Sequence, residues 1–441
     1  MYVYEKIMAS ERRNFIKTMS AVASGALTIP GMAQLTLAAE IQAASNRVKK
    51  LPINEAVTDE TFWKQVRLAY SVSPAVINLN NGGVSPQPIL VQDMLDKYNR
   101  MSNEAPSYYM WRVLDMGREP LRERLAQLAG CQADEIAINR NATEALDTVI
   151  FGIDLKEGDE VIVTKQDYPN MKQAWLQREL RDKIKLVWLD LECPKEDDSY
   201  FIKTFADAVT PKTRVVHITH LINWNGQILP CRAIADAVKA INKNIFCLAD
   251  IAHSFAHIDF KIPDLGADAA GTSLHKWLCA PFGTGMMYIK REHISSIWPL
   301  FPNDKPQSSD IRKFESQGTR SFPTEQATGY AINFHDTMGT ALKQARLHYL
   351  KNYWSQQVKD LKGITIHTPY ASAYSGAIGT FSIEHMKATE LEGKLMSAYK
   401  IHTVAIEYEK FNHVRVTPNV YTSIDDLNKL IKAITEIAAS K

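Results

Sequence analysis

Two ionisable side chains, Asp250 and Lys276, stand just past short apolar runs of the chain. Asp250 follows Ile245–Ala249, and Lys276 comes shortly after Ala269–Thr272. Each run has the length of a buried strand. In an open α/β sheet, groups that bind ligands collect where the strands end. The spacing therefore predicts a site that contains a carboxylate and an amine.

An aspartate and a lysine at strand ends are the pair that pyridoxal phosphate (PLP) chemistry requires. The lysine amine forms a Schiff base with the PLP aldehyde, and the carboxylate keeps the pyridine nitrogen protonated so that the ring accepts electrons. The plainer interpretation of Lys276 is a surface lysine, because most lysines are exposed. If these two residues were the only indication, a surface lysine would be the better interpretation of Lys276.

The neighbours of this pair favour the cofactor. The order Asp250-x-x-His253, Ser273-x-His275-Lys276 and Gly283-Thr284-Gly285 resembles the PLP segment of the class V aminotransferase family. That family includes cysteine desulfurases, selenocysteine lyases and isopenicillin N epimerase. The resemblance extends over about residues 75–435 and is closest to the epimerase-like branch.

The resemblance implies a role for each residue of the central stretch. Asp250 would pair with the pyridine nitrogen, and His253 would contact the ring oxygen. Ser273 and His275 would bind the phosphate, and Lys276 would carry the aldehyde. We expect burial and the cationic ring to lower the pKa of the lysine, as a Schiff-base lysine requires.

A second phosphate-binding segment is expected between a strand and a helix. Glu135–Asn139 has the pattern of a short strand, and an apolar helix follows it at once. The N–H groups at a helix N-terminus favour a phosphate, although an Asn or Thr there is also an ordinary helix cap. Ala142 and Thr143 match the phosphate loop of the family. In the family, the threonine of the Gly-Thr-Gly turn reaches the partner subunit's phosphate, so Thr284 implies a homodimer.

Two more positions match the ring-binding residues of the family. Tyr168 follows the strand Glu160–Thr164, where an aromatic ring can stack on the pyridine face. The desulfurases carry a histidine there, and the epimerase-like branch carries a tyrosine. Asn223 matches the residue that hydrogen-bonds the ring oxygen. Lys276, Asp250 and Tyr168 are the predicted catalytic residues.

Four residues are predicted to contact the substrate. Arg415 matches the family arginine that binds the substrate carboxylate, and a guanidinium can pair with a carboxylate through two parallel hydrogen bonds. Without that match, a surface arginine at a strand edge would be the simpler interpretation. Asn81 and Gly82 match the N-terminal loop over the substrate, although Asn-Gly-Gly is also a plain turn signal. Arg320 belongs to a matching Gly-Thr-Arg motif.

Composition gives limits but no activity. The chain has 441 residues, of which 45% are hydrophobic and 23% charged, with a formal net charge of +2. This length allows two or three domains, and the near-neutral balance gives no sign of nucleic-acid binding. The five cysteines cannot all pair, and buried free thiols are expected. No metal-ligand spacing is visible.

The N-terminus has the pattern of an export signal. Arg12-Arg13 and Phe15 precede a small-residue apolar run from Thr18 to about Ala39, which resembles a twin-arginine signal peptide. A transmembrane anchor is the alternative, but Pro30 and polar residues interrupt the run and make a stable anchor unexpected. Cleavage is expected after Ala38-Ala39 or Ala43-Ala44. Periplasmic location follows, with a cytoplasmic protein as the alternative.

The alternation of strands and helices from Glu135 to Lys290 predicts a mostly parallel sheet of about seven strands covered by helices. With the resemblance, this implies an α/β PLP-transferase fold type I. The expected divisions are a signal peptide at 1–39, a lead segment at 40–75, a large domain at 76–315 and a smaller α/β domain at 316–441. In the lead, Asp59–Val66 is expected to be an amphipathic segment capped by Thr58.

The expected elements of the smaller domain are a long helix, two strands and a terminal helix: Glu325–Val358, Thr380–Ile383, His402–Ile406 and Ile424–Ala438.

Several reactions remain open at this point. No cysteine follows Cys279, and Ala398–Phe411 offers none, so the persulfide chemistry of desulfurases is not expected. Transamination, epimerisation as in isopenicillin N epimerase, and C–S or β-elimination each can use Lys276 as the proton carrier at Cα. Transamination of an amino acid or an amino-acid-derived metabolite is the leading expectation. A PLP-binding relic without activity is the non-enzyme alternative, and Arg415 argues against it.

Overall fold

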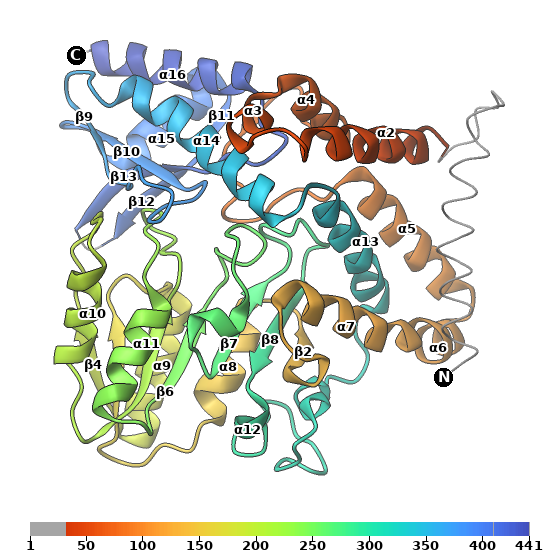
Figure 1. The fold of residues 1–441 in the computed structure, drawn as a ribbon, viewed down its shortest axis with the longest axis vertical. Helices are drawn as coiled ribbons and strands as arrows, with labels where there is room; N and C mark the ends of the chain where they lie inside the picture. Colours follow the sequence, from red (N-terminus) through yellow and green to blue (C-terminus); the bar gives the residue numbers. More distant parts are fainter. Residues whose placement is uncertain (1–31, 409, 441) are drawn as a thin grey trace.

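The computed structural model describes residues 32–408 and 410–440. Its large domain is built on a seven-stranded sheet with the order β2-β8-β7-β6-β5-β3-β4 (Figure 1). The strands are β2 (Ile136–Asn139), β3 (Glu160–Thr164), β4 (Lys185–Leu189), β5 (Thr213–Thr219), β6 (Phe246–Asp250), β7 (Ala269–Ser273) and β8 (Gly285–Ile289). Strand β8 runs antiparallel to both of its neighbours, and the other pairs are parallel. The prediction of a mostly parallel sheet of seven strands is confirmed.

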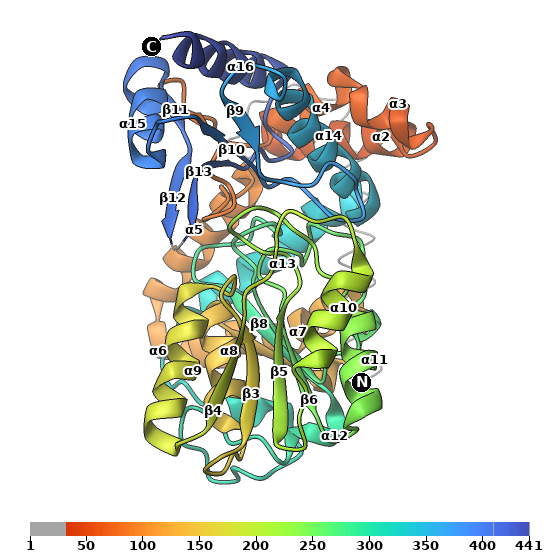
Figure 2. The same cartoon turned by 90° about the vertical axis from the view of Figure 1, so that its left-hand side faces the viewer.

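Helices cover both faces of this sheet (Figure 2). The covering helices are α8 (Ala142–Gly152), α9 (Pro169–Asp182), α10 (Asp198–Asp207) and α11 (Cys231–Ile241). Successive residues of β3 alternate between the two layers, since Val161 and Val163 pack with α8 and α9 while Ile162 packs with α10 and α11. Burial on both faces explains why the strands are almost continuously apolar.

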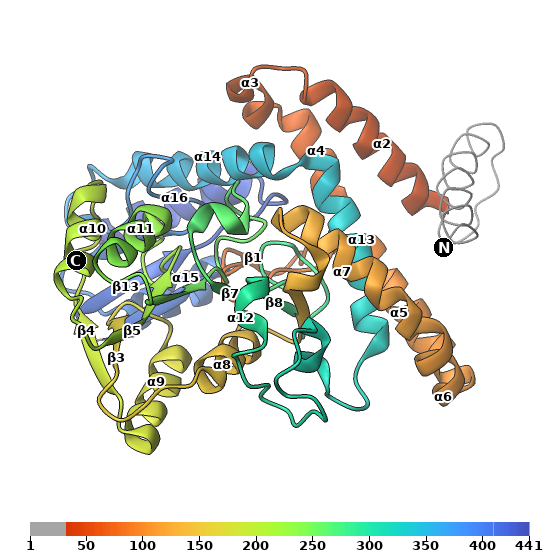
Figure 3. The same cartoon turned by 60° about the horizontal axis from the view of Figure 1, so that its bottom comes forward.

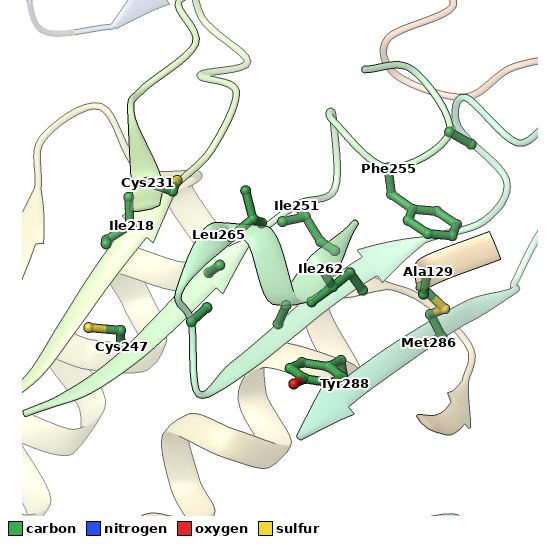
Figure 4. Close-up of a cluster of buried hydrophobic side chains, with 14 of the residues drawn as sticks. Ala129, Ile218, Cys231, Cys247, Ile251, Phe255, Ile262, Leu265, Met286 and Tyr288 are labelled. Carbon is green, nitrogen blue, oxygen red and sulfur yellow. The ribbon is translucent and has the colours of Figure 1, made fainter. Parts of the chain in front are cut away.

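The apolar core between the sheet and helices α10 and α11 also lies under the segment that follows β6. Figure 4 shows Ile218 and Cys247 on adjacent strands, with Ile251 and Met286 further across the same layer. All five cysteines are free thiols in the described part of the chain; Cys231, Cys247 and Cys279 are buried as predicted, whereas Cys131 and Cys193 are half-buried. The dense apolar layer gives the strand ends a rigid base, which a site for oriented chemistry needs.

The carboxyl ends of β5, β6 and β7 meet at one edge of the sheet. The pairing register places Asp250 beside Thr219 of β5 and Gly271 of β7. Because these strands are parallel, the residues that follow each of them also share this edge. The turns that carry Asn223, His253 and Lys276 are therefore brought together by the topology.

The smaller domain contains a four-stranded antiparallel sheet with the order β12-β13-β10-β9. Its elements are β9 (Ile364–Ile366), β10 (Gly379–Ile383), β12 (Val404–Tyr408), β13 (Phe411–Val416), α15 (Ala388–Tyr399) and α16 (Ile424–Ala439). Two of these strands and the terminal helix match the expected positions. Two further strands that the sequence analysis did not identify, β9 and β13, also join the sheet.

The long helix expected between the domains is two helices. α13 (Phe322–Met338) and α14 (Thr340–Val358) are separated by Gly339, which has φ 82° and ψ 155°. A residue with these angles cannot continue a right-handed helix, and only glycine adopts them at low cost. The expectation of one helix over Glu325–Val358 was therefore wrong.

The residues expected to form a lead segment are helical and belong to the fold. Helices α2 (Met32–Val48), α3 (Ile53–Thr58) and α4 (Glu60–Leu68) lie beside α13 and α14 (Figure 3). The Asp59 side chain caps α4 by accepting a hydrogen bond from the Phe62 N–H at 3.1 Å. The prediction that Thr58 caps this segment was wrong, because the carboxylate one residue later is at the cap.

Much of the predicted signal peptide, including Arg12 and Arg13, lies outside the described residues. The remainder falls in α2, which runs through both predicted cleavage positions. Ile41 and Ser45 of this helix are buried against the rest of the protein. Within residues 32–408 and 410–440, no helix is long and apolar enough to cross a membrane.

The other helices and one small sheet complete the fold. They are α5 (Ile89–Glu104), α6 (Pro106–Tyr108), α7 (Arg118–Ala129), α12 (Arg291–Ile294), the short turns η2 (Tyr109–Leu114), η3 (Asp115–Gly117), η4 (Ala133–Glu135), η5 (Ile262–Leu265) and η6 (Ile311–Glu315), and the pair β1 (Ile77–Asn78) and β11 (Ile401–His402). β1 is parallel to β11, so an early segment of the chain joins the smaller domain.

Candidate active site

Lys276 lies in the turn that follows β7, and its side chain is half-buried. Its Nζ is 3.0 Å from His253 Nε2 and 6.0 Å from the centre of the Tyr168 ring. Burial is the main reason that the pKa of Lys276 is lowered to about 8; the charge of Arg415 acts in the same direction, and Asp250 opposes both. An amine with this pKa is partly neutral near physiological pH, which a nucleophilic lysine needs.

Asp250 ends β6 with its carboxylate buried at the edge of the sheet. Its Oδ1 accepts a hydrogen bond from the Ala252 N–H at 2.9 Å. Burial raises the pKa of Asp250, which means that the charged carboxylate is destabilised relative to water. A cationic nitrogen next to it would offset this cost. The site therefore suits a protonated pyridine ring.

Polar atoms of the residues expected to contact the cofactor ring are left without a partner. His253 Nδ1 and Asn223 Oδ1 are buried and have no hydrogen-bond partner among the described residues. Burial, with a smaller effect of the Lys276 charge, keeps the pKa of His253 well below its usual value, so its ring is neutral. A buried unsatisfied group costs about 1–3 kcal/mol. An oxygen on a bound ring would give both atoms the partner that the sequence predicts.

The phosphate end of the site lies where β7 ends and α8 begins. Asn141 caps α8 by accepting from the Glu144 N–H, and the Ala142 N–H donates to Ser273 Oγ at 2.9 Å. Thr143 lies in the first turn of this helix. A helix N-terminus with a hydroxyl beside it favours an anion. The structure thus brings the predicted Ala142, Thr143 and Ser273 together.

Gly285 allows the start of strand β8 to approach the turn that precedes α8. A Cβ built on Gly285 would lie only 2.6 Å from the backbone of Asn141. His275 is tied to the same region, because its Nδ1 is 2.9 Å from the carbonyl oxygen of Thr284. Burial lowers the pKa of His275. The Gly-Thr-Gly turn therefore packs directly against the predicted phosphate site.

Tyr168 is the residue that precedes α9, and its side chain is 40% exposed. Pro169 occupies the first position of the helix and fixes the backbone direction there. The ring lies on the Lys276 side of the site. A partly exposed ring beside the lysine is free to stack on a planar ligand.

Arg415 of β13 is a buried cation in the same site. Its Nη1 donates to the Asn223 carbonyl oxygen at 3.0 Å, and its Nη2 donates to Asn80 Oδ1 at 3.2 Å. In the described part of the chain no carboxylate forms an ion pair with it, and its Nε has no partner. Burial lowers its pKa to about 10. An uncompensated buried guanidinium fits an anionic ligand.

The whole arrangement can now be compared with known proteins. Residues 77–405 match the family Aminotransferase class-V. The chain belongs to this family. Isopenicillin N epimerase from Streptomyces clavuligerus is 24% identical over 389 residues, covering 84% of this chain and 97% of that protein. Hercynylcysteine sulfoxide lyase from Schizosaccharomyces pombe is 20% identical over 392 residues, covering 86% and 99%. The predicted resemblance to the epimerase-like branch is confirmed.

Solved structures of class V enzymes share the fold. A C-DES mutant with glycine covalently linked to its PLP cofactor has a TM-score of 0.75 at 20% identity, covering 84% of this chain and 99% of that one. The cystine C-S lyase C-DES in complex with cysteine persulfide has a TM-score of 0.74 at 20% identity, covering 82% and 98%. The predicted α/β fold type I is confirmed, and PLP is the cofactor of this class V protein.

The residues present fit PLP, as the unpartnered His253 and Asn223 atoms and the uncompensated Asp250 show. Lys276 would hold the aldehyde carbon, Asp250 the ring nitrogen and the start of α8 the phosphate. When bound, PLP supplies an electron sink for the charge that develops at the substrate's Cα. Lys276 and Arg415 then stand ready to act on the substrate.

The loop expected over the substrate contributes a different asparagine from the predicted one. The amide of Asn81 is buried and fully used, since its Nδ2 donates to the Thr417 carbonyl at 2.8 Å and its Oδ1 accepts from the Tyr421 hydroxyl at 2.6 Å. Gly82 N–H donates to Thr417 Oγ1 at 2.9 Å. Both residues therefore anchor the loop, and their contact with the substrate stays a prediction. Asn80, which sequence reasoning missed, contacts Arg415 instead.

Arg320 does not offer a free charge to the substrate either. It pairs with Asp115 at 2.5 Å and with Glu325 at 2.7 Å, and its guanidinium lies 4.1 Å from the centre of the Phe322 ring. Two carboxylates compensate its charge, so a third anion gains little there. In this structure Arg320 is held in two ion pairs, and its contact with the substrate stays a prediction.

A cavity of about 290 Å³ lies between the Gly-Thr-Gly turn and the segment that carries Arg320. Thr284 lines it, and its hydroxyl donates to the Pro281 carbonyl at 2.6 Å. Asn139 also lines it, with both side-chain polar atoms unpartnered among the described residues. Lys276 is not among the lining residues. The contact of Thr284 with a partner subunit stays a prediction.

Proposed function

We propose that the protein acts at the Cα–H bond of an amino acid or amino-acid-derived metabolite that bears a free carboxylate, and that its reaction is transamination. The observation that carries the proposal is the uncompensated Arg415 guanidinium beside the Lys276 amine. An arginine in this position binds and orients a carboxylate, and the amine next to it can take up a proton.

Each protein group has a separate task in this proposal. Arg415 binds the carboxylate, and Asn80 and the Asn223 carbonyl hold its guanidinium in place. Lys276 Nζ takes the proton from Cα, which its lowered pKa permits. Arg415 is buried and Lys276 is half-buried, so little water is left around the reacting atoms once a ligand covers the lysine. In transamination the proton taken from Cα is delivered to a different carbon atom. Lys276 alone can carry this proton, which supports transamination.

Two other outcomes use the same groups. In epimerisation the proton that Lys276 removes is replaced by one delivered to the opposite face of Cα, and the similarity to isopenicillin N epimerase supports this outcome. Loss of a sulfur-containing side chain is supported by the similarity to hercynylcysteine sulfoxide lyase. A desulfurase mechanism with a nucleophilic cysteine is not supported, because no cysteine follows Cys279 in the sequence. A PLP-binding relic would have no need of the Arg415 arrangement.

The test uses the visible absorbance of the PLP-loaded protein while single amino acids are added without a keto acid. Transamination predicts lasting conversion of the cofactor to its amine form by at least one amino acid. A band that dips and recovers would contradict transamination, and chiral analysis of the products would then separate epimerisation from elimination. A Lys276→Ala protein with an unchanged band would contradict the assignment of the lysine.

We propose further that the protein is exported by the twin-arginine route to the periplasm. Arg12-Arg13 and the apolar run after them support this. Export in the folded state suits an enzyme that receives its cofactor before crossing. Replacing both arginines by lysine should leave the protein in the cytoplasmic fraction. Its presence in the periplasm despite that change would contradict the proposal.

A homodimer is proposed on the same family grounds, with Thr284 near the partner's site. Phe282, which is 59% exposed beside this threonine, supports a covered surface there. Light scattering after size exclusion should give twice the chain mass. A monomer that retains full activity would contradict it.

A further inference from the structure

The turn after β6 carries a second buried imidazole, His257, to which no role has been assigned. It is fully buried, and its Nδ1 lies 2.7 Å from the His253 carbonyl oxygen. Its Nε2 accepts a hydrogen bond from the Ala377 N–H at 2.8 Å. A carbonyl only accepts and an N–H only donates, so the ring is neutral with its proton on Nδ1. Its two partners thus fix both the tautomer and the orientation.

The same ring contacts the residue next to the catalytic lysine. It stacks on Trp277 with 3.9 Å between ring centres and an interplanar angle of 27°. The Trp277 carbonyl in turn accepts a hydrogen bond from the buried ammonium of Lys343 on α14. Lys276 therefore has a neighbour held by His257 on each side: His253, whose Nε2 faces its amine, and Trp277, the next residue in the chain.

His257 also contacts the smaller domain. A Cβ on Gly376 would lie 2.3 Å from His257 Nε2, so only glycine allows this approach. The segment continues from Ala377 into β10, in which Thr380 pairs with Arg415 of β13. One side chain thus connects the lysine turn with the sheet that carries the carboxylate-binding arginine.

We propose that His257 is a positioning residue that holds His253 and the Lys276 turn in place against the sheet that carries Arg415. It does not touch the reacting atoms. The hydrogen bond from His257 Nδ1–H to the His253 carbonyl keeps the His253 ring next to the Lys276 amine. The stacking of the His257 ring on Trp277 fixes the backbone after Lys276. For cofactor loading this inference rests on the family's PLP, and for turnover it rests on the function proposed above.

The first variant is His257→Phe, which keeps an aromatic ring against Trp277 and removes both hydrogen bonds. We expect PLP to load onto the apo protein about 10–100-fold more slowly, because small misplacements of reacting groups have effects of this size. The pH dependence of the visible absorbance band of bound PLP should also differ from that of the wild type. Both measurements are made without substrate.

A conservative variant and a matched control separate positioning from stability. His257→Asn keeps a donor for the His253 carbonyl, and we expect it to recover most of the loading rate. His335→Phe is the control, because His335 is also buried and its Nε2 makes a single hydrogen bond, at 2.9 Å to Thr340 Oγ1 in the corner between α13 and α14. It should lower the melting temperature but load PLP at the normal rate.

The proposal is overturned if His257→Phe loads PLP normally with an unchanged band. It is also overturned if His335→Phe slows loading to the same degree, because the effect would then follow stability alone. Failure of His257→Asn to load faster than His257→Phe would remove the role given to the His253 hydrogen bond. If the wild type converts no amino acid, the proposed function fails while the loading comparison still stands.

Discussion

At the scale of single residues, the site holds the buried Arg415 and the half-buried Lys276, with little negative charge to balance them. Burial lowers the pKa of both Lys276 and Arg415, and Asp250 is the carboxylate that raises the pKa of the lysine. A phosphate and a substrate carboxylate would supply the missing negative charge. The site is therefore electrostatically arranged for ligands that carry both groups.

Cofactor loading should depend on pH through Lys276. The neutral amine attacks the aldehyde, so the loading rate of the apo protein should rise with pH and level off above a midpoint of about 8. In Arg415→Gln the neighbouring cation is gone, the pKa of Lys276 rises, and the midpoint should move to higher pH. Stopped-flow absorbance at a series of pH values measures both. A wild-type midpoint near 10, the value of a free lysine, would contradict the prediction.

The catalytic residues were easier to predict than the substrate loop. Asp250 and Lys276 follow apolar runs, and strand ends are visible in a sequence. The role of Asn80 depends on the pairing of β1 with β11, which points it at Arg415 and leaves Asn81 buried. Successive side chains of an extended segment point to opposite sides, so a shift of one residue decides which asparagine faces Arg415. No local sequence pattern fixes that register. The partners of Arg320, distant in sequence, were hidden for a similar reason.

At the scale of elements, Gly339 decides how the domains join. Its angles end α13 and start α14 in a new direction. The apolar spacing continues across it, so periodicity alone predicts one helix. Likewise β9 and β13 are strands because they pair within the smaller sheet, whereas the buried strands of the large sheet are long apolar runs that the sequence displays directly.

Replacing Gly339 by alanine should destabilise the protein by about 1–3 kcal/mol, because its backbone lies in a region that residues with a Cβ avoid. The matched control is Gly393→Ala inside α15, where a Cβ meets nothing within 4 Å. That change should stabilise by about 0.5–1 kcal/mol through helix propensity. Urea unfolding compares the two. Equal effects of the same sign would contradict the assigned role of Gly339.

At the scale of the whole molecule, several histidines are buried in the neutral form. Burial lowers the pKa of His220 to about 4, of His257 to about 3 and of His413 to about 4. The unfolded chain would protonate them near pH 6.5. Acid should therefore favour the unfolded state well before the carboxylates titrate.

The sign of this effect is a loss of stability on acidification. Between pH 6.5 and about 4 the unfolded chain takes up protons that the folded histidines do not, so the free energy of unfolding falls as pH falls. At pH 5 each such histidine should cost about 2 kcal/mol. Melting temperatures at pH 7, 6 and 5 test this, and His220→Asn should reduce the slope. A flat profile down to pH 5 would contradict it.

The pairing of β1 with β11 has a consequence for the time order of synthesis. Asn80 and Arg415 are 335 positions apart, whereas the residues assigned to the cofactor all lie between Ala142 and Thr284. A ribosome therefore completes the cofactor's binding residues well before it adds the arginine that holds a substrate. Until β13 is synthesised, the growing chain has the lysine but lacks the arginine proposed to bind the substrate carboxylate, so the proposed substrate site is completed only at the end of synthesis.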